Sequence, residues 1–356
     1  MERIKSKWPS MGLDFQDPMM KNLAVAVATT FSCVAGGMYI YRYIQKYKIK
    51  QRIKERREEC KMSCERMAEH LNLNGLSLEK RNSILKLPIK ELQSKLQSGE
   101  LKALEVLQAY QSKALEIDKY LNCIVEPIWE AEEMALERDL DTKKKGILHG
   151  IPVSIKECFC LKGYDCTGGM CIYMDQPVED DSPFIKVLKK QGAVPFVRTN
   201  IPQTMMTFDC SNPQYGQTVN PHDHKRGPGG SSGGEGAVIG GGGSILGFGT
   251  DIGGSIRIPS NMCGVYGLKP TYGRLSVKNN HPFQRGQPIV KATTGPMAQD
   301  VDGLVLAMTA LLDPFMFELD PDIPPVPFRR EIYEDNRPLR IGYYVDDASS
   351  LSATRC

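Results

Sequence analysis

The sequence predicts an α/β domain carried on one membrane-spanning helix, and three observations lead to this prediction. Segments with the patterns of strands and of helices alternate from residue 83 onward, as in a sheet flanked by helices. Twenty uncharged residues run from 22 to 41, about the ~20 that cross a bilayer as a helix. The stretch 227–260 is rich in glycine and serine yet carries apolar residues throughout, which indicates a site rather than a flexible linker.

The composition is that of an ordinary globular protein. The chain has 356 residues, of which 41% are hydrophobic and 24% charged, and its net charge of +3 requires no nucleic-acid partner. Its eleven cysteines make an odd number. Four of them lack the paired spacing of a zinc site and have no histidine among them: Cys158, Cys160, Cys166 and Cys171. We therefore expect no metal and no cofactor, and free thiols in a reducing compartment.

The N-terminal region divides into a segment at 1–21 and a transmembrane helix at 22–41. A cleaved signal peptide fits less well, because the apolar run begins far from the N-terminus and exceeds the usual ~7–15 residues. A buried core helix remains an alternative, since Thr29, Thr30, Gly36 and Gly37 weaken the hydropathy of the run.

A basic juxtamembrane helical segment is expected at 42–82. Eight lysine and arginine residues fall between Arg42 and Arg57, and by the positive-inside bias they place the C-terminal body in the cytosol. We expect an integral protein of an intracellular membrane, the endoplasmic reticulum. The basic run is suited to anionic lipid headgroups, or it is simply a solvated helix.

The globular pattern occupies 83–345. Leucines at helical spacing predict one helix through Leu87, Leu92 and Leu96 and another from Leu104 to Leu115. Further along, apolar runs predict strands at 123–125, 151–155 and 193–197, and helical patterns cover 128–140 and 183–190. Residues 339–345 resemble one more strand, and a polar tail follows at 346–356.

The glycine-rich stretch is the most informative part of the chain. Twelve of the twenty-three residues from Gly227 to Gly249 are glycine, so backbone must approach something closely there. No lysine follows these glycines as in a Walker loop, and the third glycine of a dinucleotide fingerprint would fall on Ile252. A serine on a glycine-flanked turn suits a nucleophile beside free N–H groups, although a solvated structural turn has the same composition.

Several long motifs in this region form a recognisable set. GGSSGGEGA is followed by GTDIGGSIRIPS, with IPVSIKECF before them and CGVYGLKPTYGRLS and GPMAQDV after them. The chain resembles the amidase signature family, and within it the fatty acid amide hydrolases, from about Leu85 to Tyr344. The resemblance implies the amidase signature fold, a central mixed sheet covered by helices.

The resemblance also implies a Ser-Ser-Lys triad. Ser255 would attack the amide carbonyl, Ser231 would relay the proton and Lys156, at the end of the predicted strand 151–155, would accept it. Lysine must be neutral to act as a base, so its pKa must fall from ~10.4 through desolvation. In the family the peptide bond before the relay serine, here Gly230–Ser231, is cis.

Further site residues are carried over from the family in the same way. The backbone N–H groups of Ile252, Gly253, Gly254 and Ser255 would form the oxyanion hole. Ser232, Thr250, Asp251 and Arg257 would support the loops. An apolar acyl channel would be lined by Met205, Met206 and Phe208, for which ordinary core packing is an equal alternative.

These inferences lead to a membrane-anchored, homodimeric serine amidase that hydrolyses fatty acid amides, such as N-acylethanolamines and primary amides. The alternative is a truncated, weakly active or inactive isoform acting as a membrane-bound partner of a full-length copy. The family's chains continue well beyond this length, so we expect an unfinished sheet and little activity from these 356 residues. A general small-amide amidase would lack the membrane segment.

Overall fold

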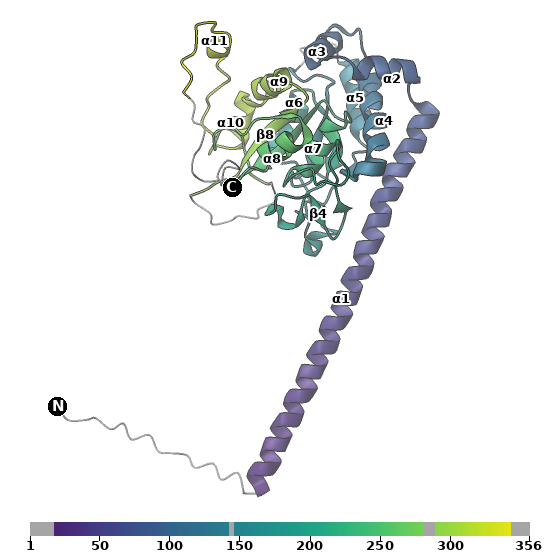
Figure 1. The fold of residues 1–356 in the computed structure, drawn as a ribbon, viewed down its shortest axis with the longest axis vertical. Helices are drawn as coiled ribbons and strands as arrows, with labels where there is room; N and C mark the ends of the chain where they lie inside the picture. Colours follow the sequence, from purple (N-terminus) through teal and green to yellow (C-terminus); the bar gives the residue numbers. More distant parts are fainter. Residues whose placement is uncertain (1–17, 142–145, 281–288, 343–356) are drawn as a thin grey trace, which may run out of the picture.

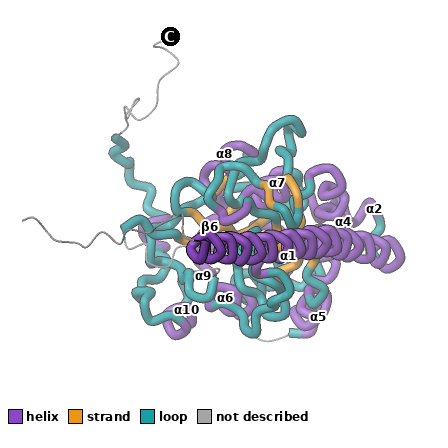
Figure 2. Tube along the Cα trace, turned by 90° about the horizontal axis from the view of Figure 1, so that it is seen from below, coloured by secondary structure: helices purple, strands orange, loops and turns teal. Residues whose placement is uncertain are grey.

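The computed structural model describes residues 18–141, 146–280 and 289–342. Within them, one long helix projects from a body in which helices surround a six-stranded sheet (Figure 1). Seen from below, with α1 running across the picture, the strands lie inside the body and the helices outside (Figure 2).

The sheet is mixed, and its central strands carry the candidate site. The strand order is β1 (Ile124–Pro127), β3 (Val194–Thr199), β2 (Pro152–Lys156), β6 (Leu246–Asp251), β8 (Thr293–Ala298) and β7 (Tyr266–Gly267). Strand β2 runs parallel to both β3 and β6, whereas β1 and β8 are antiparallel to their neighbours. All five residues of β2 are buried, as expected for a parallel strand covered on both faces. A separate hairpin pairs β4 (Ser211–Asn212) with β5 (Gly216–Gln217).

Helix α4 (Ala103–Leu121) shows why these sequences form the helical layer. Apolar residues recur at helical spacing along it, and those at Val106, Tyr110 and Ile117 are buried in the core. The helix ends at Asn122, whose left-handed backbone (φ 51°) suits a C-terminal cap. It packs against α2 (Leu78–Leu85), α5 (Ala131–Leu140) and α7 (Gly233–Gly240).

The remaining helices complete the layers around the sheet. They are α3 (Ile89–Ser98), α6 (Pro183–Lys190), α8 (Arg257–Cys263), α9 (Val301–Leu311), α10 (Pro314–Leu319) and α11 (Arg330–Tyr333), with short 3-10 turns η1 (Cys171–Tyr173) and η2 (Gln203–Met205). The helix expected at 183–190 is confirmed by α6, and the strands expected at 151–155 and 193–197 are confirmed by β2 and β3, shifted by one or two residues.

The strand expected at 339–345 is wrong over its described part. Residues 339–342 form no strand, and the side chains of Leu339 and Ile341 are exposed. An apolar alternating run becomes a strand only where a neighbouring strand completes its hydrogen bonds, and this run has no such neighbour among the described residues. Residues 343–345 and the expected polar tail lie outside the described residues.

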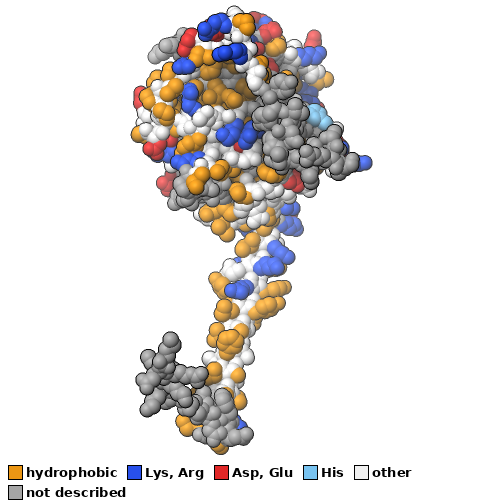
Figure 3. All heavy atoms as spheres, turned by 60° about the vertical axis from the view of Figure 1, so that its left-hand side comes forward, with side chains coloured by type: hydrophobic (Ala, Val, Ile, Leu, Met, Phe, Trp, Pro, Cys, Tyr) orange, Lys and Arg blue, Asp and Glu red, His pale blue; other side chains and the backbone are white. Residues whose placement is uncertain are grey.

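Helix α1 (Pro18–Asn74) is continuous over 57 residues and contains the expected span at 22–41. It is the one helix in the described residues that is long and apolar enough to cross a membrane, and its apolar half is exposed. Figure 3 shows this half as an apolar stalk, with lysine and arginine side chains where the stalk approaches the body.

The second half of α1 is docked on the body. Arg52 bonds to Asp175, the mostly buried Arg56 lies 3.4 Å from Asp165, and Arg57 donates to the Pro213 carbonyl at 2.8 Å. Buried packing begins at Met67 and Leu71, earlier than the boundary expected at residue 83. The docking leaves five of the eight basic residues of 42–57 exposed and away from the body: Arg42, Lys46, Lys48, Lys50 and Lys54.

A carboxyl group ties α7 to the centre of the sheet. Glu235 on α7 is fully buried and accepts hydrogen bonds from the hydroxyls of Ser154 on β2 (2.6 Å) and Thr199 on β3 (2.7 Å). Burial raises the pKa of Glu235 to about 7, and the two hydroxyl hydrogen bonds oppose the shift without cancelling it. The folded chain therefore holds a proton at Glu235 that the unfolded chain releases nearer pH 4.5.

The Glu235→Gln variant is expected to remove a pH dependence of stability. A carboxyl whose pKa is raised on folding contributes stability below its unfolded pKa and loses it as pH rises through the folded pKa. Relative to the variant, the wild type should lose about 3 kcal/mol of unfolding free energy between pH 5 and pH 8. Denaturant unfolding of the detergent-solubilised chain at both pH values measures this difference. The exposed Glu133→Gln is the matched control, and equal pH dependence in wild type and Glu235→Gln contradicts the assignment.

Candidate active site

Lys156 is the last residue of β2, and its side chain is completely buried. Its Nζ donates to Ser231 Oγ at 2.7 Å and to Thr250 Oγ1 at 2.8 Å. Among the described residues it forms no ion pair. Desolvation lowers the pKa of Lys156, and the attraction of the surrounding acidic groups does not cancel this effect. The site therefore contains an amine biased towards its neutral form and in contact with two hydroxyls.

Ser231 lies in the turn that leads into α7. The Gly230–Ser231 peptide bond is cis, as the resemblance implied. A Cβ atom at Gly230 would lie 2.2 Å from the Asp209 carbonyl oxygen, so only glycine fits beside the backbone at Asp209. The next residue, Ser232, donates its N–H to the Ser255 carbonyl at 3.0 Å. The turn is thus held against the loop that carries the candidate nucleophile.

Asp251, at the end of β6, organises that loop. Its carboxylate accepts the N–H groups of Gly254 (2.7 Å) and Ile256 (3.1 Å) and binds the Arg257 guanidinium at 3.0 Å. Burial opposes ionisation, but the hydrogen bonds from Arg257 and from the loop outweigh it and hold the pKa of Asp251 below its usual value. Asp251 and Arg257 therefore close the turn around Ser255.

The predicted oxyanion donors divide into two groups. The Gly254 N–H is already bonded to Asp251, whereas the N–H groups of Ile252, Gly253 and Ser255 bond to no described residue. The Ser255 hydroxyl also has no partner among the described residues, and 6% of this residue is exposed. A hydroxyl and three free N–H groups on one short turn match the requirements of a nucleophile with an oxyanion hole.

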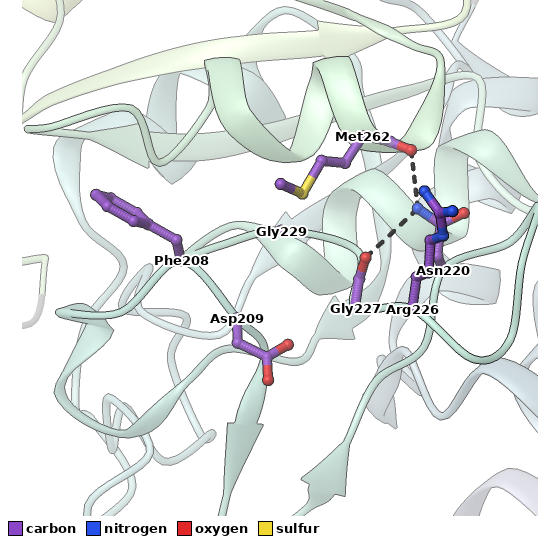
Figure 4. A pocket seen from close by; sticks show the side chains of 7 residues that line it. All are labelled: Phe208, Asp209, Asn220, Arg226, Gly227, Gly229 and Met262. Carbon is purple, nitrogen blue, oxygen red and sulfur yellow. Dashed lines mark hydrogen bonds between the residues drawn. The ribbon is translucent and has the colours of Figure 1, made fainter. Parts of the chain in front are cut away.

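The three residues expected in the acyl channel differ in their surroundings. Met205 packs against the core, while Met206 and Phe208 are 67% and 63% exposed. Of the three, only Phe208 lines a cavity of about 410 Å³. The other lining residues are Asp209, Asn220, Arg226, Gly227, Gly229 and Met262 (Figure 4).

This cavity adjoins the serine turn, because Gly229 immediately precedes the Gly230–Ser231 bond. Figure 4 shows Asn220 holding the wall together: its amide donates to the carbonyl oxygens of Met262 (2.8 Å) and Gly227 (3.5 Å). Asn220 and Met262 were not predicted. Asn220 lies in the segment 208–221, whose sequence is FDCSNPQYGQTVNP, and nothing in its spacing distinguishes it from other loop amides.

Glu157 is a second residue that sequence reasoning missed. Its buried carboxylate accepts the N–H (2.6 Å) and hydroxyl (2.7 Å) of Thr167 and the N–H of Gly168 (3.0 Å). These bonds hold the chain that follows Lys156. An acid directly after a fully buried strand was the available signal, since such a charge needs dedicated partners. In the described part of the chain no three metal-ligating side chains gather.

Comparison with known proteins agrees with this geometry. A model of the amidase family matches residues 105–354. Fatty-acid amide hydrolase 1 of Sus scrofa is 46% identical over 264 residues, which are 74% of this chain and 45% of that protein. Vitamin D3 hydroxylase-associated protein of Gallus gallus is 46% identical over 264 residues, 74% of this chain and 57% of that protein. The chain spans about half the length of these relatives.

Solved structures show the same architecture. A fatty acid amide hydrolase superposes with a TM-score of 0.73 at 33% identity, covering 80% of this chain and 55% of that one. The peptide amidase of Stenotrophomonas maltophilia gives a TM-score of 0.59 at 28% identity, covering 68% and 51%. With a family model that matches most of its length and a sheet that superposes on these structures, the chain belongs to the amidase family.

Proposed function

We propose that this chain carries the catalytic machinery of a serine amidase with a Ser255, Ser231 and Lys156 triad. The observation that carries the proposal is the complete burial of Lys156, whose amine lies 2.7 Å from Ser231. A neutral amine has two N–H groups and one lone pair, so it donates to Thr250 while accepting the proton of Ser231.

In the proposed reaction the groups act in the following order. Ser231 passes its proton to Lys156 and takes one from Ser255, whose oxygen attacks the amide carbonyl. The free N–H groups of Ile252, Gly253 and Ser255 stabilise the negative charge on the carbonyl oxygen. The proton returns through Ser231 to the leaving amine, and water releases the acid from Ser255 by the same relay.

The proposed substrates are fatty acid amides, including N-acylethanolamines and primary amides. Similarity to fatty-acid amide hydrolase 1 of Sus scrofa supports this, as do the apolar side chains of Phe208 and Met262 at the cavity beside the serine turn. We further propose that α1 anchors the chain in an intracellular membrane, the endoplasmic reticulum, with the body in the cytosol and a second copy as its partner. The exposed apolar span and the basic residues after it support the anchor and its orientation.

A membrane-bound, non-catalytic partner of a longer copy is the second candidate. It is favoured by the exposure of Met206 and Phe208, because an acyl-binding surface open to water leaves a long chain poorly buried. Covalent labelling of the chain separates the two functions, since a serine-reactive probe needs an assembled triad but no bound acyl chain.

Ser255→Ala is expected to abolish labelling of the chain by a fluorophosphonate, because it removes the only hydroxyl assigned as nucleophile. Gel fluorescence of the detergent-solubilised full chain measures the label. Ser211→Ala is the matched control, since Ser211 is exposed on β4, and it should label like wild type. Full labelling of Ser255→Ala contradicts the assignment, and an unlabelled wild type favours the non-catalytic function.

Lys156→Ala is expected to slow this labelling by about 10²–10⁴-fold, the usual contribution of a general base. In the wild type the rate should rise with pH through a pKa below the ordinary 10.5 of lysine, because only the neutral amine accepts a proton. Lys156→Glu should move the inflection to lower pH, since a carboxylate is basic there. The control is the exposed Lys162→Ala. A pH profile unchanged in Lys156→Glu would exclude the base role.

Removal of residues 1–41 is expected to leave salt-sensitive binding to vesicles containing anionic lipid. The residues that dock α1 on the body begin at Arg52, so the exposed lysines before it remain in place. Vesicle sedimentation should show binding at low salt that is lost near 0.5 M, where screening length falls to roughly 4–5 Å. Replacing Lys46, Lys48 and Lys50 by glutamate is the control, and no binding at low salt argues against a lipid contact.

A further inference from the structure

The loop that follows Lys156 contains a pair of thiols that the proposed chemistry does not use. Cys160 is partly exposed and Cys166 is buried, and they lie at the two ends of a short turn. Within it the Tyr164 N–H bonds to the Leu161 carbonyl at 3.1 Å, which folds the two ends towards each other. The thiol of Cys166 donates to the Cys158 carbonyl at 3.2 Å, and its sulfur is the largest influence on the pKa of Cys160.

The surroundings of this pair distinguish it from the other thiols of the body. The Cys166 thiol, and then the positive charge of Arg198, hold the pKa of Cys160 below its usual value. Burial raises the pKa of Cys158 to about 11 and that of Cys210 to about 12. Cys160 thus combines access to solvent with a stabilised thiolate, which is the combination that makes a cysteine reactive.

The partner thiol is positioned to resolve an oxidised Cys160. The Cys166 sulfur also contacts the Cys158 carbonyl at 3.2 Å, so it is held in place next to Cys160. Arg198 donates to the Glu157 carbonyl at 2.6 Å and to the Asp165 carbonyl, which fixes both branches of the loop. No third metal ligand joins the pair among the described residues, so a metal site does not explain it.

We propose that Cys160 and Cys166 form a peroxide-sensitive dithiol that closes reversibly to a disulfide in the loop after Lys156. The Cys160 thiolate attacks one oxygen of hydrogen peroxide, the O–O bond breaks, and sulfenic acid and hydroxide form; hydroxide takes a proton to become water. The Cys166 sulfur then attacks the sulfenic sulfur, the S–O bond breaks, and the Cys166 proton leaves with the oxygen as water. Two thiols and one peroxide give one disulfide and two waters.

Oxidation alters the loop close to the amine. The Cys166 sulfur loses the proton that it donates to the Cys158 carbonyl, and the Cys158 sulfur lies 3.9 Å from Thr250, the second partner of Lys156. In a reducing compartment such a disulfide is transient, as regulatory disulfides are. A slower reaction at Ser255 in the oxidised chain follows from this geometry and rests on the proposed amidase function.

The disulfide is tested by mapping, which does not depend on any activity. The detergent-solubilised full chain is reduced, treated with hydrogen peroxide and alkylated, and then digested with trypsin. Cleavage after Lys156, Lys162 and Lys186 gives one peptide with Cys158 and Cys160 and a second with Cys166 and Cys171. Fragment-ion spectra of the joined peptides then show whether the bond links Cys160 to Cys166. We expect this joined pair, its loss on dithiothreitol treatment, and oxidation of Cys160 about tenfold faster than of Cys171, whose pKa is raised by burial.

Two variants and one control complete the test. In Cys166→Ser, Cys160 should stop at sulfenic acid and react with dimedone, whereas in Cys160→Ser, Cys166 should stay alkylatable. Cys171→Ser should form the joined peptides as the wild type does. Pairing of Cys160 with another cysteine, or oxidation of Cys160 no faster than of Cys171, overturns the proposal. If mapping succeeds while labelling at Ser255 is absent, the dithiol stands and the amidase function falls.

Discussion

The buried contact between Lys156 and the hydroxyls of Ser231 and Thr250 is the constraint on which the rest of the site depends. An ammonium group without a carboxylate partner is very costly inside a protein, so this position favours the neutral amine. The three side chains come from the end of β2, the turn before α7 and the end of β6. Because β2 and β6 are adjacent and parallel, their carboxyl ends meet at one edge of the sheet, where open α/β sheets place their ligands.

The density of glycine follows from the same constraint. A Cβ atom at Gly247 would lie 2.0 Å from Glu235, and one at Gly249 would lie 2.6 Å from Ser232. Each of these glycines lets α7 and its leading turn approach β6 closely enough for Ser231 to reach Lys156. The glycine-rich sequence predicts a close approach of the backbone without indicating what it approaches. In the structure, Gly247 and Gly249 lie against other segments of the same chain. A Cβ atom at Gly253, by contrast, would meet no atom within 4 Å.

The central part of the fold was predictable because its signals are local. Strand β2 is a mostly apolar run ending in a lysine, and α6 begins with proline and has an apolar face, so each was found within one or two residues. Contacts between distant segments left no such signal. Neither the wall formed by Asn220 and Met262 nor the bonds of Glu157 could be read from spacing. In the part of the chain that the structure describes, the apolar run after Arg337 has no neighbouring strand to pair with.

The docking of α1 connects this helix to Lys156, the proposed base, through a short chain of polar contacts. Arg56 on α1 lies 3.4 Å from Asp165 and 3.8 Å from Glu126, and Glu126 accepts a 2.6 Å bond from the buried Arg198. Arg198 in turn holds the Glu157 carbonyl, one residue after Lys156. Because several of these charges are buried and each has its partner, removing one leaves the next uncompensated, at a cost of several kcal/mol. These contacts therefore link the second half of α1 to the loop after Lys156.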